Sequence, residues 1–413
     1  MKNTSVVDDV AAPLLRLLLV SVFLLAPTGC RDSGDAPPEV AADLSAPDSA
    51  GVEIISMSDS REAERVTLGE PLSRVGWSGG DPPFQALRHG RLLPDGSVLV
   101  VDVIARRMYH LSDQLELVDS VGGPGEGPGE FESIARIAAV SSDSIVAYDL
   151  TSNRVTTFFD TAVATRQMAE DRPAVFHAPS GVMADGRVFW GIYGATPYKL
   201  QSEGPLRAAV LVGDARGEAL DTLASVDFVD IVRVGSRLQP RPMGTEGLTA
   251  PTPEGFVWAS NGLPEIRWFS AEGELFRILR WIEKAEALDD EYWEDFVEAQ
   301  VVTFTTDVGS PLPEEFVRDR YAGWHPVLPE TLAPFLEPQF GSDGSIWLRR
   351  RPPLGEEESA YLVVSPDGRC LRNLLPPARF VFMDSRDGSV LGIELNELDV
   401  PSAVLYRLEP CSP

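Results

Sequence analysis

The chain has 413 residues, of which 44% are hydrophobic and 24% are charged, a composition typical of a globular protein with a large core. Its formal net charge of −28 argues against a surface that binds nucleic-acid phosphates or docks through a basic patch on anionic lipid. We therefore expect no nucleic-acid partner and interpret the acidity as a solvated, soluble surface.

Residues 1–29 have the pattern of an export signal. Lys2 gives a positive start, and residues 17–26 form an apolar run that is interrupted only by Ser21 and is too short to span a bilayer. The run leads into Pro27-Thr28-Gly29-Cys30, which resembles a bacterial lipoprotein cleavage segment, although a leucine is usual where Pro27 stands. We predict that Cys30 is lipidated and anchors an exported protein at the cell envelope, in the periplasm or at the cell surface. Ordinary cleavage that leaves a free cysteine is the alternative.

Residues 30–51 are rich in Asp, Ser, Pro and Ala and contain almost no large apolar side chains. Such a segment buries too little apolar surface to become ordered. It is predicted to be a disordered tether, and residues 52–413 are predicted to be the folded domain.

From Val52 onward, short apolar runs recur after turns that contain an acid or a glycine. Asp-Gly between two apolar runs is a strong hairpin signal, because glycine accepts the positive φ of tight turns. A second turn and strand follow in each unit, which gives four-stranded antiparallel units of about 42 to 48 residues. Six such units predict an all-β, six-bladed β-propeller. The six leading turns are at residues 94–96, 142–144, 184–186, 253–255, 342–344 and 386–388.

The apolar pattern within the strands supports this architecture. Residues 98–101 are continuously apolar, as expected for a strand that is covered on both faces by neighbouring blades. The last unit provides only three strands before the chain ends. We predict that the early run Arg65–Leu68 supplies the missing outer strand of the last blade and closes the ring.

An insertion with helical character separates the fourth and fifth units, at about residues 283–338. From Leu288 to Val301, apolar residues recur at helical spacing, and acids occupy the expected first turn. A second short helix is predicted to begin at Pro313. We expect this insertion to cap one end of the propeller.

Residues 122–131 contain five glycines and two prolines and end in Phe131. This composition excludes a helix or an interior strand. It predicts a loop of defined conformation that connects the first two blades. The motif Gly127-Pro128-Gly129-Glu130-Phe131 closely resembles the GPGEF segment of bacterial six-bladed β-propeller proteins, and Ser342–Leu348 is similar to another strand of that family. The resemblance covers roughly residues 52–411. It implies an exported or lipid-anchored, monomeric propeller related to the NHL type, and it implies no catalytic residues.

The candidate metal ligands are inferred only from the predicted positions of the strands. His89 and His177 are placed on the innermost strands of blades one and three, and His325 lies in the approach to blade five. These three imidazoles are candidate ligands for a divalent metal in the central channel, which is the one cofactor we consider. The alternative is that they are structural or surface residues.

A candidate ligand-binding wall combines Trp324, Trp347 and Arg349 near the insertion. The alternative is that the arginines pair with the many carboxylates of the chain. Cys370 and Cys411 are placed at the outer strand ends of neighbouring blades, and in an exported protein they are predicted to form a disulfide.

The resulting hypothesis is a membrane-tethered binding or scaffold module with a protein or small-molecule ligand. The alternative is an NHL-type or lactonase-like, metal-dependent hydrolase or lyase with its site in the central channel.

Overall fold

The structure is a computed structural model, and it describes residues 39–41, 51–76, 84–142, 144–159, 162–168, 173–214, 220–306, 312–352, 360–409 and 411. The predicted signal peptide and Cys30 lie outside the described residues. Residues 31–38 and 42–50 of the predicted tether do so as well, whereas residues 39–41 form the short strand β1 (Glu39–Ala41), which pairs with the end of β21 (Leu275–Lys284).

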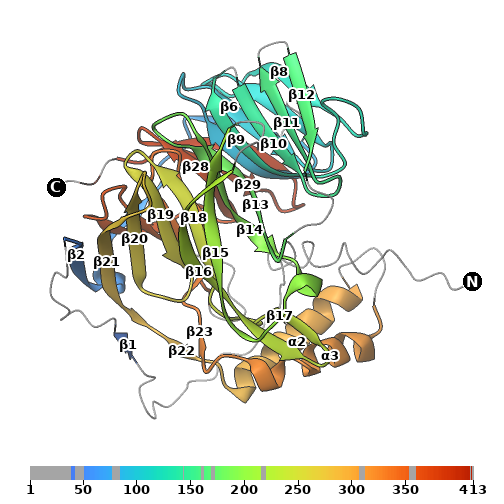
Figure 1. Ribbon diagram of the computed structural model, residues 1–413, viewed down its shortest axis with the longest axis vertical. Coiled ribbons are helices and arrows are strands. Elements are labelled where there is room, and N and C mark those ends of the chain that lie inside the picture. Colours follow the sequence, from blue (N-terminus) through green and yellow to red (C-terminus); the bar gives the residue numbers. More distant parts are fainter. Residues whose placement is uncertain are drawn as a thin grey trace, which may run out of the picture.

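Six antiparallel sheets are arranged in a ring and form the predicted six-bladed β-propeller (Figure 1). Blade 1 contains β5 (Leu87–Leu92), β6 (Val98–Asp102), β7 (Arg107–Leu111) and β8 (Leu117–Gly122). Blade 2 contains β9 (Ile134–Ser141), β10 (Ser144–Asp149), β11 (Arg154–Phe159) and β12 (Ala162–Gln167). Blade 3 contains β13 (Val175–Val182), β14 (Val188–Ala195), β15 (Gly204–Gly213), β16 (Asp221–Val234) and β17 (Arg237–Pro240).

Blade 4 contains β18 (Gly247–Thr252), β19 (Gly255–Ser260), β20 (Glu265–Ser270) and β21. Blade 5 contains β24 (Phe335–Phe340), β25 (Ile346–Arg350), β26 (Tyr361–Val364) and β27 (Leu371–Leu375). Blade 6 contains β28 (Phe380–Arg386), β29 (Ser389–Leu395) and β30 (Pro401–Arg407). The first strand of each blade is the innermost one, and the chain enters all six innermost strands at the same end of the ring.

Closure of the ring differs from the expectation in one respect. The strand that completes blade 6 is β4 (Ser73–Gly76), which pairs antiparallel with β30. The predicted closing run belongs instead to β3 (Glu64–Thr67), which adds in parallel to β27 of blade 5. Farther upstream, β2 (Glu53–Asp59) adds in parallel to β21 of blade 4. The N-terminal part of the domain is thus a strap, residues 53–76, that covers the outer edges of three consecutive blades.

The interior of the ring lies between neighbouring blades, as the continuous apolar runs predict. Val98 and Val100 of β6 pack against blade 6, whereas Leu99 and Val101 of the same strand pack against blade 2. Successive side chains of a strand point to opposite faces, so each inner strand contributes to two interfaces. Burying both faces excludes water from the interfaces between blades and accounts for the absence of alternation in the sequence.

The glycine-rich connection carries the chain from blade 1 into blade 2. The backbone of Phe131 bonds to Gly123 and Gly125, and the ring is fully buried between the two blades. Gly125 has a φ of +152°, a backbone conformation that favours glycine, and a Cβ at this position would also displace the Glu130 carboxylate, which would lie 2.1 Å away. The predicted role of this stretch as a shaped, aromatic-anchored connection is confirmed.

The insertion contains β22 (Glu286–Ala287), α2 (Asp290–Thr306), α3 (Glu314–Ala322), the 3₁₀ turn η3 (His325–Val327) and β23 (Thr331–Leu332). It leaves β21 and enters β24, so it stands at the end of the ring where the inner strands begin. There it packs against the β16–β17 hairpin of blade 3, and Arg241 donates to the Val327 carbonyl at 2.8 Å. Figure 1 shows the helices beside β17 and away from blades 1 and 2. The insertion therefore lies along one side of this end of the ring.

The predicted disulfide between Cys370 and Cys411 is present, with an S–S distance of 1.97 Å. It joins the start of β27 in blade 5 to the segment that follows the last strand of blade 6. In the part of the chain that is described, no helix combines the length and the apolar character needed to cross a membrane.

Candidate functional site

The three candidate metal-binding histidines occupy different surroundings. His325 lies on the surface of the insertion and bonds to Asp290 at 3.0 Å, whereas the ring of His177 bonds to the Ala209 carbonyl within blade 3 at 2.7 Å. His89 has no hydrogen-bond partner among the described residues. The described residues also contain no group of three or more His, Cys, Asp or Glu side chains that could hold a metal ion.

The candidate aromatic and cationic wall is also dispersed. Trp347 is fully buried between blades 5 and 6, where it stacks on Phe382 with ring centroids 4.0 Å apart. Trp324 belongs to the helical insertion and packs edge-on against Tyr321. The half-buried Arg349 has an Nε atom without a hydrogen-bond partner in the described residues. The structure does not bring these three side chains together.

Arg350, the middle residue of the arginine run, is part of a buried polar network. It donates to the Glu283 carboxylate at 3.0 Å, to the Ser60 hydroxyl at 2.8 Å and to the Asn373 side chain at 3.1 Å. Ser60 and Trp281 donate to the other oxygen of Glu283. The network joins the strap to blades 4 and 5. Its hydrogen bonds therefore have a structural role and require no ligand.

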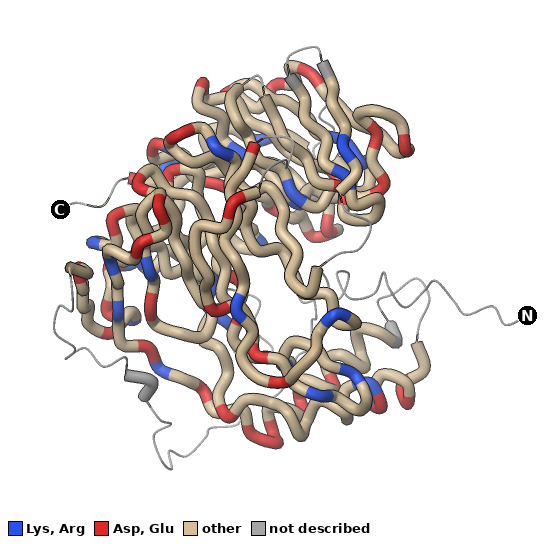
Figure 2. The backbone as a smooth tube through the Cα atoms, viewed as in Figure 1, with Lys and Arg blue, Asp and Glu red and all other residues tan. Residues whose placement is uncertain are grey.

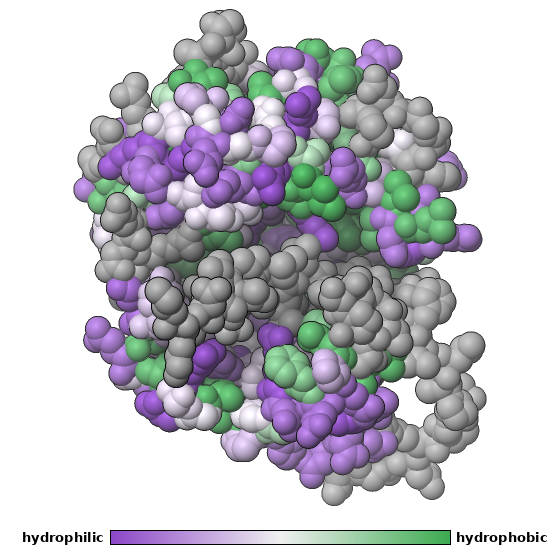
Figure 3. Space-filling model, turned by 90° about the vertical axis from the view of Figure 1, so that its right-hand side faces the viewer, coloured by the Kyte–Doolittle hydropathy of each residue, from purple (hydrophilic) through white to green (hydrophobic). Residues whose placement is uncertain are grey.

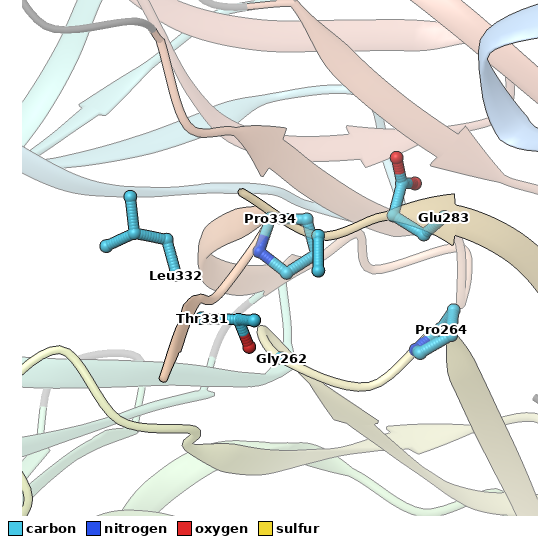
Figure 4. A pocket seen from close by; sticks show the side chains of 7 residues that line it. Gly262, Pro264, Glu283, Thr331, Leu332 and Pro334 are labelled. Atoms are coloured by element: carbon cyan, nitrogen blue, oxygen red, sulfur yellow. The ribbon is translucent and has the colours of Figure 1, made fainter. Parts of the chain in front are cut away.

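A small pocket borders this network between blades 4 and 5 (Figure 4). It encloses about 230 Å³, including space open to solvent. Its only charged side chain is Glu283, and both carboxylate oxygens already accept hydrogen bonds. The remaining lining residues are Gly262, Pro264, Ala285, Thr331, Leu332 and Pro334. The pocket therefore offers little to a polar ligand.

A different set of side chains converges on the axis of the ring. The third residue of an innermost strand is ionisable in four blades, namely His89, Arg136, His177 and Glu337. Arg136 of blade 2 and Glu337 of blade 5 approach to 3.6 Å, although their blades lie on opposite sides of the ring. Their side chains retain 31% and 46% of their exposure. The axis is thus narrow at this level and accessible to solvent.

Aromatic residues border the same level. The Arg136 guanidinium lies 5.5 Å from the centre of the Tyr193 ring, which packs in turn against Phe176 and Tyr148. Arg88 precedes His89 on β5; its side chain is exposed and forms no hydrogen bond or ion pair with the described residues. An exposed guanidinium without a partner among the described residues is a ready donor for an anion.

Farther along the inner strands, a second pair of arginines lies around a buried acid. Arg91 of β5 bonds to the Met383 carbonyl at 3.4 Å, and Arg386 of β28 bonds to the Leu92 carbonyl at 2.9 Å. Asp384 is fully buried, and burial raises the pKa of its carboxyl while the Arg91 charge opposes that rise. We call Arg88, His89, Arg91, Arg136 and Arg386 the axial cluster.

The charges of the axial cluster act on one another. Burial lowers the pKa of His89 well below 6.5, and the charges of Arg136, Arg91 and Arg88 lower it further. Burial also lowers the pKa of Arg91, which feels the charges of Arg136 and Arg386. Among the described residues, the carboxylates that act on these arginines are Glu337, which pairs with Arg136, and Asp384, whose charge acts on Arg91.

This local charge stands out against the rest of the protein. Figure 2 shows acidic residues spread over the outer loops and along the helical insertion, consistent with the net charge of −28. On the face seen in Figure 3, the surface is hollowed between the upper blades and the lower part that carries the insertion. An anion near the axial cluster therefore meets positive charges in an otherwise acidic protein, which favours charge-selective binding.

The sequence analysis placed His89 correctly on an innermost strand but missed the arginines. They are spread from residue 88 to residue 386, and no local motif links them. The available signal was positional, because Arg88, Arg91, Arg136 and Arg386 all belong to the first strand of a blade.

Comparisons with solved structures find matches at low identity. A protein of Bacteroides fragilis that is described as exported matches with 11% identity and a TM-score of 0.48, over 86% of this chain and 100% of that one. A member of the DUF4221 family from Bacteroides vulgatus matches with 8% identity and a TM-score of 0.45, over 83% and 98%. A streptogramin B lyase matches with 10% identity and a TM-score of 0.39, over 79% and 95%. No family model matches the chain, and no curated protein does so.

Proposed function

We propose that this protein is a binding module of the cell envelope, anchored through Cys30, that holds an anionic ligand at the axial cluster. The observation that carries the proposal is the convergence of cations on an accessible axis in a strongly acidic protein. Arg88 and His89 support the proposal most strongly, because neither side chain has a hydrogen-bond partner among the described residues. Intramolecular pairing, which accounts for Arg350, does not account for them.

The charge of the site also favours an anion over a divalent metal. Unpaired guanidinium groups repel a cation, whereas they form short, charge-assisted hydrogen bonds with carboxylate or phosphate oxygens. The proposed ligand class is therefore a carboxylate or another oxyanion that is small or narrow enough to enter at the level of Arg136 and Glu337. The resemblance of the GPGEF motif supports the exported, tethered setting of this module.

Calorimetric titration of the purified mature protein with acetate, sulfate and citrate tests the ligand class. We expect binding that weakens at least about tenfold in Arg88→Met and in Arg136→Met, since each variant loses one charge-assisted contact. Arg237→Met is the matched control, because Arg237 is an exposed arginine of β17 outside the axial cluster. Equal affinities in all three variants would refute an axial site.

Cell fractionation tests the anchor separately. The wild-type protein should sediment with membranes, and Cys30→Ser should appear in the soluble fraction after export, because its thiol acceptor for the lipid is gone. A Cys30→Ser variant that still sediments with membranes would contradict the tethered setting without affecting the ligand site.

A further inference from the structure

The contact between Arg136 and Glu337 is an ion pair without a hydrogen bond. Nη2 of Arg136 lies 3.6 Å from Oε1 of Glu337, which is farther than hydrogen-bonded atoms lie from each other. Neither side chain forms a hydrogen bond with the other described residues. The guanidinium therefore keeps its N–H donors, and the carboxylate keeps its acceptor sites, for other groups. Because 31% and 46% of the two side chains are exposed, a ligand from solvent can supply those groups.

The backbone is irregular at two residues that contact Arg136. In β24, Leu336 and Glu337 lie together opposite Arg349 of β25, which is a β-bulge. In blade 3, Tyr193 is the extra residue at a bulge of β14. A bulge turns side chains out of the regular alternation of a strand, and bulges are common beside functional sites. Glu337 reaches Arg136 across the ring, and the Tyr193 ring lies 5.5 Å from the same guanidinium.

The two opposite charges of this pair restrict the kind of ligand that can bind beside it. A simple anion at Arg136 is repelled by the Glu337 carboxylate, which lies next to its binding partner. A simple cation at Glu337 is repelled by Arg136 in the same way. A ligand that carries both charges on neighbouring atoms avoids both penalties, because its anionic group binds the guanidinium while its cationic group binds the carboxylate.

We infer that Glu337 determines the specificity of the axial site and that the ligand is an amino carboxylate, in which one carbon joins the ammonium group to the carboxylate. This inference rests on the proposed anion-binding function and adds a second ligand charge of opposite sign. The ligand carboxylate accepts hydrogen bonds from Arg136, and the ligand ammonium donates to Glu337. A free amino acid has this chemistry.

Matched pairs of small ligands test the inference by calorimetric titration of the mature protein. Glycine is compared with acetate, and alanine with propionate, because the members of each pair differ only by an ammonium group in place of a hydrogen. We expect each amino carboxylate to bind at least about fivefold more tightly than its partner, since it adds one charge-assisted hydrogen bond. A ratio of one or less in both pairs overturns the inference.

Glu337→Gln should reverse this preference, because the ammonium group then meets the Arg136 charge without a carboxylate beside it. Acetate and propionate should bind more tightly to the same variant, since the repelling charge is gone. Glu337→Asp retains the charge and should keep a ratio above one. An unchanged ratio in Glu337→Gln would contradict the assigned role of this residue.

Glu272→Gln is the matched control for the loss of one negative charge. Glu272 is an exposed residue of the turn between β20 and β21, which are the outer strands of blade 4. This variant should keep the wild-type ratio, and a ratio that falls as far as in Glu337→Gln would show an effect of net charge alone. Circular dichroism and the thermal midpoint verify that all variants fold, as expected for substitutions of partly exposed side chains.

The outcomes separate the two proposals. Acetate binding that is lost in Arg136→Met, without a preference for glycine in the wild-type protein, retains the anion site and refutes the amino carboxylate. Absence of any binding that depends on Arg136 or Arg88 refutes both.

Discussion

Replacing Phe131 by alanine tests how the glycine-rich connection is held. The ring is fully buried between blades 1 and 2, with its centroid 6.1 Å from that of Phe158. A phenylalanine side chain buries about 150 to 200 Å², and at about 25 cal/mol per Å² this contributes roughly 4 to 5 kcal/mol. Alanine retains about 1 kcal/mol of it, so the free energy of unfolding should fall by about 3 to 4 kcal/mol, within the usual range for such changes.

Equilibrium unfolding in guanidinium chloride measures this loss as a shift of the midpoint at constant slope. The control is Leu117→Ala on β8, whose side chain is 41% exposed and whose removal should cost less than about 1 kcal/mol. The double variant with Phe158→Ala should show coupling between the two rings, because they share one interface. A loss of less than about 1 kcal/mol in Phe131→Ala, or one no larger than in the control, would show that Phe131 does not anchor the connection.

Three further predictions follow from the same structure. Glu283→Met leaves the Arg350 guanidinium half-paired in a buried network, so unfolding by denaturant should show a loss of about 3 to 5 kcal/mol. Anion binding should strengthen as the pH falls, because burial and the neighbouring arginines hold the pKa of His89 well below its ordinary value in the free protein and a bound anion raises it. Calorimetry in two buffers of different ionisation enthalpy should then show proton uptake on binding, and His89→Gln should abolish that uptake. The Cys370–Cys411 disulfide closes a loop with a sequence separation of 41, so its replacement by two serines should cost about 4 kcal/mol in thermal unfolding, and an unchanged midpoint would contradict this.

The blades were predictable because their signals are local. An acidic or glycine turn followed by a continuous apolar run fixes a hairpin within about ten residues, and residues 98–101 illustrate how two-sided burial follows from composition alone. The two helices of the insertion were predicted for the same reason, since apolar spacing and first-turn acids lie within each helix.

The closing strand was misplaced because two short runs compete for one edge. Residues 64–67 and 73–76 both have the length of an edge strand, and nothing within either run says which partner lies hundreds of residues away. The earlier run pairs in parallel as a fifth strand of blade 5, an arrangement without a hairpin signal. The axial cluster was missed for a related reason, because Arg136 and Arg386 come close enough to act on Arg91 only after the ring has formed.

The strap sets the order in which the fold can be completed. Its strands lie at residues 53–76, yet their partners are β21, β27 and β30, the last of which ends at Arg407. Contacts of such separation form late, because the loop between them must first be closed. Until the whole chain is available, three outer edges in the C-terminal half stay open to pairing with other molecules. The interval between synthesis of the first strand and the last is therefore the period in which this protein is most exposed to aggregation.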